Sequence, residues 1–550
     1  MKNKLKEVVL KAATELCGGN LPENFDFELM PPKDPAHGDL ACNVAMKISK
    51  VVGKNPRDTA LLIKQQLESS VSDILEKVEI AGPGFLNFYL KKITRGLIVR
   101  DILFAKEKYG RSDYGKGLKT VVEFVSANPT GPLTIAHGRQ AAIGDCLVRI
   151  LKAAGFDTSA EYYLNDAGRQ MRLLGGSVFA RYSSEFGKAR ELPEDGYRGS
   201  YIFDLAKDLI KAKGDALLKL PVEDAEAQCT DYAKDTIMSW IKKDLETTRC
   251  HFDNFYSERT LYAENKVEEA LNLLKDRGYI FESEGAVWFR STDLGDDKDR
   301  VVKKSTGEYT YLAPDIAYHM TKYNRGFRKI VNLWGPDHHG YIPRLKAACQ
   351  VLGYDADKIH VGIVQLSTLY RKGEPMKMST RAGEFITYKE LYEEVGVDAA
   401  RLFFVLRRQE SHLDFDLEVA KEKSQENPVY YLQYAHARIC SLIQKADRKI
   451  SDNPDVAILA KLETEEEGDL IGTLGQFSDY IRQSAETLEP YRMVDYLRQL
   501  SASFHKFYSQ CRVVTEDAAL TEARLELCEA TRIVLRNGLE LLGISQPTSM

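Results

Sequence analysis

The chain carries three successive patterns of apolar and polar positions. In the first 110 residues, apolar side chains recur every three or four positions, which predicts helices at 1–20, 40–52 and 57–69. Shorter apolar runs bounded by glycine- and proline-rich turns predict strands at 25–30, 78–80 and 85–90. We therefore expect a small α+β unit over residues 1–110.

The middle of the chain alternates strand-like and helix-like stretches. Strand, helix and strand follow one another at 120–126, 135–154 and 159–164, and the same order returns at 329–334, 341–352 and 359–366. This alternation is typical of βαβ units in a parallel, doubly wound sheet. A mostly charged helical pattern interrupts the alternation. We predict a Rossmann-like domain over residues 111–424, with a helical insertion at about 168–300.

The last part of the chain has a helical pattern almost throughout. Its long amphipathic stretches lie at 428–445, 469–487, 493–508 and 525–542. They predict an all-α bundle over residues 425–550. The sequence as a whole therefore indicates a multidomain α/β protein with three units.

Composition narrows the class of protein. The 550 residues are 44% apolar and 29% charged, which is ordinary for a globular chain and excludes collagen-like and disordered classes. No apolar run is long enough to span a membrane. The nine cysteines form no Cys-x-x-Cys pair, which favours reduced thiols over a disulfide framework or a zinc site. We expect a cytoplasmic protein that binds no zinc. The net charge of −5 gives no sign of a nucleic-acid partner.

The first candidate site is the loop 126–139, which leaves a predicted parallel strand and opens a helix. Pro129 and Gly131 prevent the strand from continuing. Ligands bind at this edge of a parallel sheet, and helix N-termini there favour phosphate groups. Thr134 and His137 lie in the first helical turn, within reach of such a group. A helix cap beside a structural histidine is the alternative interpretation.

The second candidate site is the polar loop 377–383, which follows a predicted strand. Taken alone, Lys377 and Arg381 are typical of solvated surface charges. Beside the first loop they form a second phosphate clamp. Positive groups in that position stabilise charge on a pentacoordinate phosphorus and on a leaving pyrophosphate.

These two loops resemble the HIGH and KMSKS elements of class I aminoacyl-tRNA synthetases. The fuller runs at 126–139, 311–318, 334–340 and 377–385 resemble bacterial-type arginyl-tRNA synthetases, in that family's order. The first 110 residues resemble the family's additional N-terminal domain, and the last 126 resemble its anticodon-binding domain. The resemblance covers the whole chain. It implies an arginine–tRNA ligase whose substrates are ATP, arginine and tRNA-Arg.

The resemblance places arginine between the first strand of the middle unit and a helix across the cleft. The implied contacts are Glu123, Ser126, Asn128, Tyr311 and Asp315. Because a guanidinium is planar and permanently charged, it favours carboxylates arranged as a fork. We expect Asp315 to bind it, and leave Glu123 and Asn128 to the guanidinium or to the α-amino group. A carboxylate at a strand edge is the alternative for Glu123, and a core aromatic is the alternative for Tyr311.

The resemblance also implies contacts to ATP in three segments. They are Pro129, Gly131, His137 and Gly138 in the first loop, Asp337, His338 and Gly340 after a later strand, and Lys377, Met378 and Ser379 in the second loop. Mg²⁺ is expected to accompany ATP. A metal site at His338 and His339 is the alternative, but no third His or Cys lies at ligand spacing.

The chain departs from the family pattern at two positions. Thr134 replaces the first histidine of HIGH, and Thr380 replaces the second lysine of KMSKS. Gly131 stands where some relatives carry a compensating lysine. Cationic catalysis therefore falls to the remaining charges of the second loop or to a residue that the sequence does not identify. The catalytic residues that we predict are Thr134, His137, Lys377 and Arg381.

Contacts to tRNA are implied at both ends of the chain. Phe85 and Asn87 match an aromatic-x-Asn pair that reads the D-loop, by stacking and an amide hydrogen bond. Tyr431 and Tyr434 lie three apart on one helix face and, with Met550, match the anticodon contact. Burial in the protein core is the alternative for all three aromatic residues.

We therefore predict an enzyme that positions its substrates and stabilises charge. The arginine carboxylate attacks the α-phosphorus of ATP, and the resulting arginyl-adenylate transfers arginine to the terminal adenosine of tRNA. We expect a monomer without membrane contact. Three alternatives stay open: another class I specificity, an RNA-binding paralogue without catalysis, and a small-molecule nucleotidyltransferase. The last leaves the two terminal units without a role.

Overall fold

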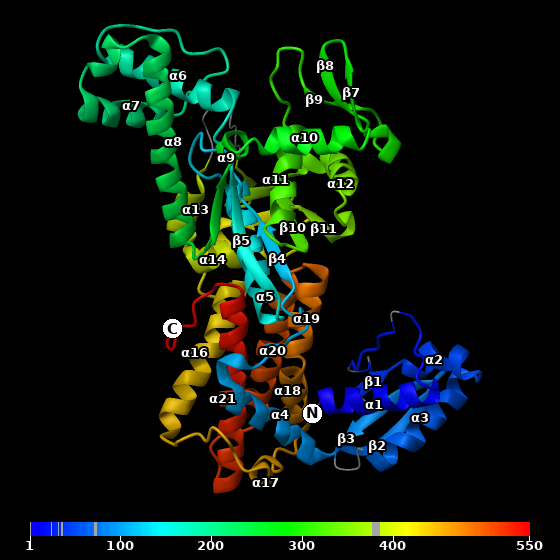
Figure 1. The fold of residues 1–550 in the computed structure, drawn as a ribbon. Helices are drawn as coiled ribbons and strands as arrows, with labels where there is room; N and C mark the ends of the chain where they lie inside the picture. The colour runs from blue at the N-terminus through cyan, green and yellow to red at the C-terminus, as the bar shows by residue number, and fades with distance from the viewer. Residues whose placement is uncertain are drawn as a thin grey trace.

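The computed structural model describes residues 2–23, 25–30, 32, 34, 37–70, 74–376 and 386–550. Its elements form a small N-terminal unit set apart from a longer body (Figure 1). The N-terminal unit contains α1 (Lys2–Leu16), β1 (Leu40–Cys42), α2 (Val44–Val52), α3 (Pro56–Ser70), β2 (Leu75–Ala81) and β3 (Phe85–Leu90). The connecting helix α4 (Lys92–Ala105) packs against helices of the C-terminal bundle.

The N-terminal unit is an α+β fold with its own hydrophobic core. Its antiparallel sheet has the strand order β1-β3-β2, and apolar residues from the three helices cover it. Two predictions here were wrong. The strand predicted at 25–30 is reduced to a single bridge from Met30 to Ala41, and the helix predicted at 40–52 begins as strand β1. Pairing of Ala41 with Asn87 on β3 overrides the helical spacing.

The body is built on a five-stranded parallel sheet with the order β11-β10-β4-β5-β6. Its strands are β4 (Lys119–Glu123), β5 (Asp157–Leu164), β6 (Asn254–Ser257), β10 (Lys329–Trp334) and β11 (Ile359–Ile363). Helices that connect or flank them are α5 (Ile135–Ala153), α9 (Glu258–Ala263), α10 (Lys266–Asp276), α11 (Leu312–Asn324) and α12 (Ile342–Val351). The predicted doubly wound parallel sheet is confirmed.

The segment predicted as a helical insertion is more varied than its charge pattern indicated. It begins with α6 (Arg169–Glu185), α7 (Ser200–Lys213) and α8 (Val222–Thr247), which pack together. It then returns to the main sheet as β6, and β7 (Ile280–Ser283), β8 (Ala286–Phe289) and β9 (Arg300–Lys303) form a separate antiparallel sheet. Because β6 has only four residues, all half-buried, its sequence shows no strand alternation.

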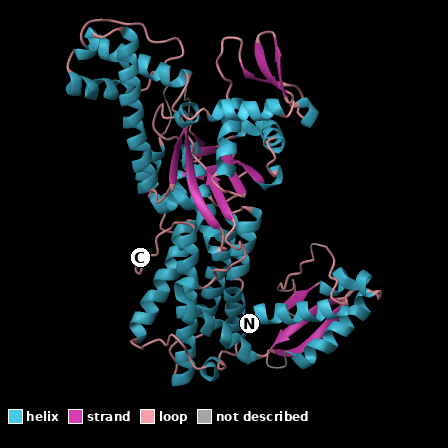
Figure 2. Cartoon of the chain, in the orientation of Figure 1, coloured by secondary structure: helices cyan, strands magenta, loops and turns pink. Residues whose placement is uncertain are grey.

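The C-terminal part of the body is helical, as Figure 2 shows below the main sheet. A transition region contains β12 (Ser367–Arg371), β13 (Glu374–Pro375), α13 (Tyr388–Val395), α14 (Val397–Phe404), β14 (Leu413–Asp416) and α15 (Leu417–Lys421). The bundle consists of α16 (Pro428–Ala446), α17 (Val456–Leu459), α18 (Glu465–Gly475), α19 (Phe477–Thr487), α20 (Tyr491–Gln510) and α21 (Ala518–Leu541). One hydrophobic core runs from Val122 on β4 through Leu147 on α5 to Leu535 on α21. The predicted fold class is thus confirmed.

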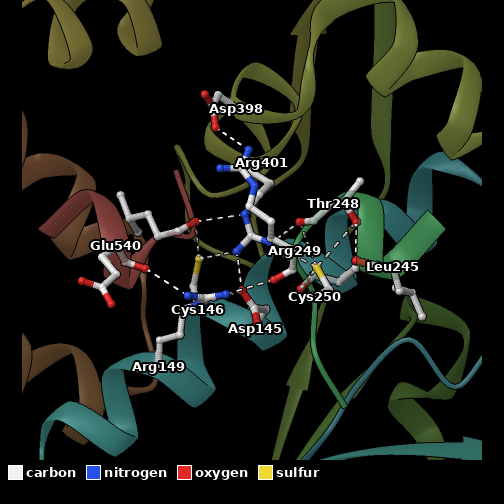
Figure 3. Close-up of polar contacts among 12 residues, drawn as sticks. Asp145, Cys146, Arg149, Leu245, Thr248, Arg249, Cys250, Asp398, Arg401 and Glu540 are labelled. Atoms are coloured by element: carbon white, nitrogen blue, oxygen red, sulfur yellow. Dashed lines mark hydrogen bonds and ion pairs between the residues drawn. The ribbon is translucent and has the colours of Figure 1, made fainter. Parts of the chain in front are cut away.

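A buried arginine ties the sheet to the C-terminal residues (Figure 3). Arg401 on α14 is fully buried, and its guanidinium donates to Asp145 on α5, to the Thr248 carbonyl after α8 and to the Leu542 carbonyl after α21. The second bond measures 2.7 Å and the third 3.1 Å. Four segments that are far apart in the sequence therefore meet at Arg401, and one of them is α5, the helix that follows the first candidate loop.

Candidate active site

Two of the segments predicted to bind ligands, 126–139 and 334–340, follow neighbouring strands at the centre of the sheet. From β4 the chain continues to β5 and β6 on one side, while β10 and β11 lie on the other side. The carboxyl ends of β4 and β10 therefore flank a topological switch point, where ligands bind in open α/β sheets. The loop 126–139 follows β4, and the short helix Pro336–Tyr341 follows β10. The fold thus brings both predicted segments to one crevice.

The backbone is strained where it leaves β4. Val125 and Ser126 both have left-handed backbone conformations, with φ of 67° and 40°. Such conformations cost non-glycine residues about 1–3 kcal/mol each and concentrate at functional sites. The Ser126 hydroxyl donates to Glu123 Oε1 at 3.1 Å and accepts from the Tyr163 amide at 3.1 Å. These two bonds hold Ser126 at the mouth of the crevice.

Thr134 and His137 form a cap at the start of α5. The Thr134 amide donates to His137 Nδ1 at 3.1 Å, in a reciprocal capping box. Burial lowers the pKa of His137 to about 4, so the ring is neutral at pH 7. With Nδ1 accepting, the ring proton lies on Nε2, which is left to donate to a ligand. The helix N-terminus adds a partial positive charge. The predicted cap and the predicted anion site therefore coincide at Thr134 and His137, at the start of α5.

The segments around this loop are packed tightly against it. A Cβ on Gly138 would lie 2.4 Å from the Tyr388 ring, and a Cβ on Gly131 would lie 3.2 Å from the Tyr201 ring. Pro129 is buried beside them. Tyr201, on α7, also donates to the Thr130 carbonyl at 2.8 Å. The helical segment 169–247 therefore contacts the first loop directly.

The residues that follow the second loop contact the first loop. Thr387 forms a bridge with Thr134, and the Tyr388 amide donates to the Leu133 carbonyl at 2.8 Å. On the other side, the Met376 amide donates to Leu369 on β12 at 2.8 Å. The predicted residues Lys377, Met378, Ser379, Thr380 and Arg381 lie outside the described residues.

The three acidic residues near the crevice have different environments. Glu123 accepts from the Lys322 ammonium at 2.5 Å, so its charge is already neutralised. Burial raises the pKa of Asp315 to about 7; Glu123 and Glu258 add to the rise, while Tyr341 and Lys322 oppose it. Burial also raises the pKa of Glu258, which accepts from the Tyr262 hydroxyl at 2.8 Å. Among the described residues, no lysine or arginine pairs with Asp315 or Glu258.

Two further predicted arginine contacts are Tyr311 and Asn128. Tyr311 precedes Asp315 by one turn at the start of α11, and its side chain is 68% exposed. The alternative of a core aromatic is therefore excluded for Tyr311. The Asn128 amide nitrogen donates to Gln170 Oε1 on α6 at 2.6 Å, which leaves its carbonyl oxygen for a donor ligand.

The segment after β10 is exposed at the edge of the crevice. Asp337, His338 and Gly340 are all exposed, and His338 Nε2 lies 3.5 Å from Asp337 Oδ2. The His338 ring also contacts Trp334, with centroids 5.9 Å apart. These groups offer a carboxylate, an imidazole and an open backbone to a ligand that enters from solvent.

The predicted RNA-contacting residues lie far from the crevice, in the two terminal units. Phe85 is 40% exposed at the start of β3, whereas Asn87 on the same strand is 4% exposed. Tyr431 and Tyr434 are half-buried on α16 and flank the His505 ring, with centroids 5.4 Å and 6.3 Å away. Met550 is 55% exposed.

Two residues of the candidate site were not predicted from the sequence. Glu258 begins α9 directly after β6, a strand too short to be recognised. Lys322 lies two turns after Asp315 on α11. The sequence signal for it is a charged residue at a position that the helical period places on the buried face. No helix among the described residues is both long and apolar enough to cross a bilayer.

Comparisons with known proteins cover the whole chain. The "Arginyl tRNA synthetase N terminal domain" matches residues 2–90, the "tRNA synthetases class I (R), catalytic domain" residues 98–443, and the "DALR anticodon binding domain" residues 432–550. Arginine–tRNA ligase 1 of Halalkalibacterium halodurans is 45% identical, and the arginine–tRNA ligase of Geobacillus kaustophilus is 47% identical. Each match covers 100% of this chain and 99% of the relative.

A solved structure shows the same fold over the full length. Thermus thermophilus arginyl-tRNA synthetase superposes with a TM-score of 0.78 at 22% identity, and the match covers 100% of both chains. The class I catalytic family matches more than half of the chain, and the relatives above are similar from end to end. The chain therefore belongs to the arginyl-tRNA synthetases, the class I arginine–tRNA ligases.

Proposed function

We propose that this chain activates arginine with ATP and transfers it to tRNA-Arg, with the guanidinium held between Asp315 and Glu258. The observation that carries the proposal is the pair of carboxyls, Glu258 buried and Asp315 half-buried, that have no cationic partner among the described residues. Burying a carboxylate is costly unless a positive charge compensates it. A bound guanidinium supplies that charge, together with donors in the geometry that carboxylates accept.

The other ends of arginine and ATP have matching groups in the crevice. Ser126 and the Asn128 carbonyl face the place of the α-amino group, while Tyr311 lies at the mouth. Thr134, His137 and the N-terminus of α5 bind the ATP phosphates, with Pro129, Gly131 and Gly138 giving the backbone its close approach. Asp337, His338 and Gly340 contact the ribose and adenine. Lys377, Met378, Ser379 and Arg381 complete the phosphate site.

The reaction proposed here needs positioning more than proton transfer. The arginine carboxylate attacks the α-phosphorus, pyrophosphate leaves, and a terminal ribose hydroxyl of tRNA then displaces AMP from the acyl group. Neutral His137 donates a hydrogen bond to phosphate oxygen without changing its protonation state. Mg²⁺ would enter with the ATP phosphates, because it binds oxygen ligands and is commonly held through substrate phosphates.

The tRNA contacts proposed for this chain are Phe85 and Asn87 for the D-loop, and Tyr431, Tyr434 and Met550 for the anticodon. The corresponding domain boundaries are 1–110, 111–424 and 425–550. The separate core of the first unit, which covers residues 5–90, and the helical content of the last support a division into three units. We further propose that the chain acts as a monomer in the cytoplasm.

The test of the arginine site is Asp315→Asn, with Glu264→Gln as the control. Glu264 is exposed and follows the same short helix that Glu258 begins. Loss of one partner of a buried charge pair costs about 3–5 kcal/mol, so we expect the KM for arginine in ATP–pyrophosphate exchange to rise by about 10²–10³-fold. The KM for ATP should stay the same. An unchanged KM for arginine would exclude Asp315 as the guanidinium ligand.

A further inference from the structure

Lys322 is a buried ammonium beneath the proposed arginine site. Its side chain has no exposed surface. Its Nζ donates to Glu123 Oε2 at 2.5 Å and to Asn332 Oδ1 at 2.9 Å, and lies 4.3 Å from the centre of the Tyr318 ring. Glu123 on β4 and Asn332 on β10 are directly paired across the switch point of the sheet. The ammonium therefore joins the two strands at the base of the crevice.

The first branch of contacts leads from Lys322 to Asp315. Because an ammonium can only donate, Asn332 presents its oxygen to it and its amide nitrogen to His319 Nε2, 2.8 Å away. Burial, reinforced by the Lys322 charge, lowers the pKa of His319 to about 3, so the ring is neutral. Its Nε2 accepts, and its Nδ1 donates to the Asp315 carbonyl at 2.8 Å. Each group in this branch has only one orientation available.

The second branch leads from Lys322 to Ser126. Glu123 accepts from the ammonium at one oxygen and from the Ser126 hydroxyl at the other, 3.1 Å away. That hydroxyl then accepts from the Tyr163 amide, also at 3.1 Å. Since the backbone of Ser126 is in a left-handed conformation with φ of 40°, this bond opposes relaxation of the turn.

We propose that Lys322 is a positioning residue for arginine, because its ammonium orients both walls of the site at once. One wall is α11 with Asp315, and the other is the turn at Ser126. The ammonium also cancels the charge of Glu123, so the carboxyls left to a ligand are Asp315 and Glu258. This inference rests on the proposed binding of arginine between those two carboxyls. It assigns Lys322 no contact with substrate.

The charge of Lys322 has a consequence for selectivity. If the ammonium is removed, Glu123 becomes a third unpaired carboxyl in the crevice. Asn332 then loses the partner that fixes its amide, so the branch to Asp315 no longer has a single orientation. Both effects act on the binding of arginine. Neither acts on Thr134 or His137 at the ATP end of the crevice.

The experiment compares Lys322→Met, Glu123→Gln/Lys322→Met and the control Lys329→Met. Lys329 is a half-buried lysine at the opposite end of β10, outside both branches. ATP–pyrophosphate exchange is measured with saturating tRNA, and thermal melting checks that each variant is folded. We expect Lys322→Met to raise the KM for arginine by about 20-fold or more, with the KM for ATP changed less than about twofold.

The double variant separates positioning from simple loss of stability. It leaves no unpaired charge, so we expect it to recover part of the loss, to about fivefold above the wild-type KM for arginine. If Lys322→Met does not fold, the double variant carries the same test. A KM for arginine within about twofold of wild type in the tested variant, or an equal rise in both KM values, overturns the proposal. The variant Asp315→Asn distinguishes the two causes of such a result. If it also leaves the KM for arginine unchanged, the proposed arginine site is wrong. If it alone raises the KM for arginine, only the role of Lys322 is wrong.

Discussion

The guanidinium of Arg401 donates to the carboxylate of Asp145, and the two side chains are 0% and 4% exposed. Asp145 lies on α5, whose N-terminus carries Thr134 and His137. The remaining donors of Arg401 bind carbonyl groups of Thr248 and Leu542. The orientation of α5, the helix that opens the proposed ATP site, is thus fixed partly by residues at the far end of the chain.

We expect Arg401→Met to destabilise the protein by about 3–5 kcal/mol, because it leaves the Asp145 carboxylate buried without its main partner. Replacing both residues with apolar side chains should cost less than the single change. Arg149→Met is the matched control, since Arg149 also bonds Asp145 at 2.7 Å but is partly exposed. Urea unfolding followed by tryptophan fluorescence measures the differences. Equal losses for Arg401 and Arg149 would contradict this account.

Arginine binding should depend on pH through Asp315. Burial raises the pKa of this carboxyl from 3.8 to about 7 in the free protein. Its contribution to stability is therefore fully present below about pH 3.8 and is lost as the pH rises through about 7. Because the guanidinium binds the ionised form, arginine affinity should rise from pH 6 to 8, and binding should release protons near pH 6.5.

Calorimetric titration in two buffers of different ionisation enthalpy measures that proton release. Asp315→Asn should abolish it, and Glu264→Gln should leave it unchanged. A binding heat that is independent of the buffer near pH 6.5 would show that Asp315 is already ionised in the free protein.

Periodicity predicted the fold class because the long elements are amphipathic and the strands of the sheet centre are strongly apolar. It failed where tertiary pairing decides the structure. Strand β6 is four residues long and has no alternation, and Leu40–Cys42 is extended because it pairs with β3. Elements of this length carry too few positions for a period to be recognised.

The predicted site shows the same limit. The residues that follow β4 and β10 meet because parallel strands end at one edge, and this follows from topology. The pairing of Glu123 with Lys322 does not follow from topology, because 199 residues separate the two in the sequence. That pairing favours a structural role for Glu123, as a support for Ser126, while its predicted contact with arginine stays a prediction. The roles of the individual site residues stay predictions.

Tyr431 and Tyr434 should contribute to the use of tRNA without affecting amino-acid activation. Each ring is half-buried beside His505, and the Arg438 guanidinium lies 5.1 Å from the Tyr434 ring centre. Base stacking on an aromatic ring is worth about 1–3 kcal/mol, so each alanine variant should lower kcat/KM for tRNA by about 5- to 150-fold.

The control for these variants is Phe104→Ala, which removes a ring that is 75% exposed on α4. Removal of the whole bundle is unsuitable, because one hydrophobic core joins it to the sheet. Aminoacylation with varied tRNA gives kcat/KM, and the KM values for arginine and ATP are measured in parallel. If tRNA kinetics are unchanged in both tyrosine variants, these residues belong only to the bundle core.

The last prediction concerns the cation that stabilises the leaving pyrophosphate. His137 is neutral, and Thr134 brings no charge. Arg139, although on the same helix, is fully buried and donates to the Gln365 and Arg408 carbonyls at 2.8 Å and 3.1 Å. Lys322 is bound to Glu123. Two buried cationic residues, Arg139 in the first loop and Lys322 on α11, are thus already engaged, which directs the search to Lys377 and Arg381.

We expect Lys377→Ala or Arg381→Ala, but not both to the same extent, to slow adenylate formation by about 10²–10³-fold, the scale for loss of one transition-state donor. The Kd for arginine should stay the same, because the lost contact acts when charge moves onto pyrophosphate. Single-turnover adenylate formation with saturating ATP and tRNA measures the rate, and Lys372→Ala, an exposed lysine before the loop, is the control. If both variants and their combination keep the wild-type rate, the second loop provides no charge stabilisation. Transition-state stabilisation would then rest on the α5 N-terminus, His137 and the ATP-bound metal, and His137→Ala should become the most damaging single change.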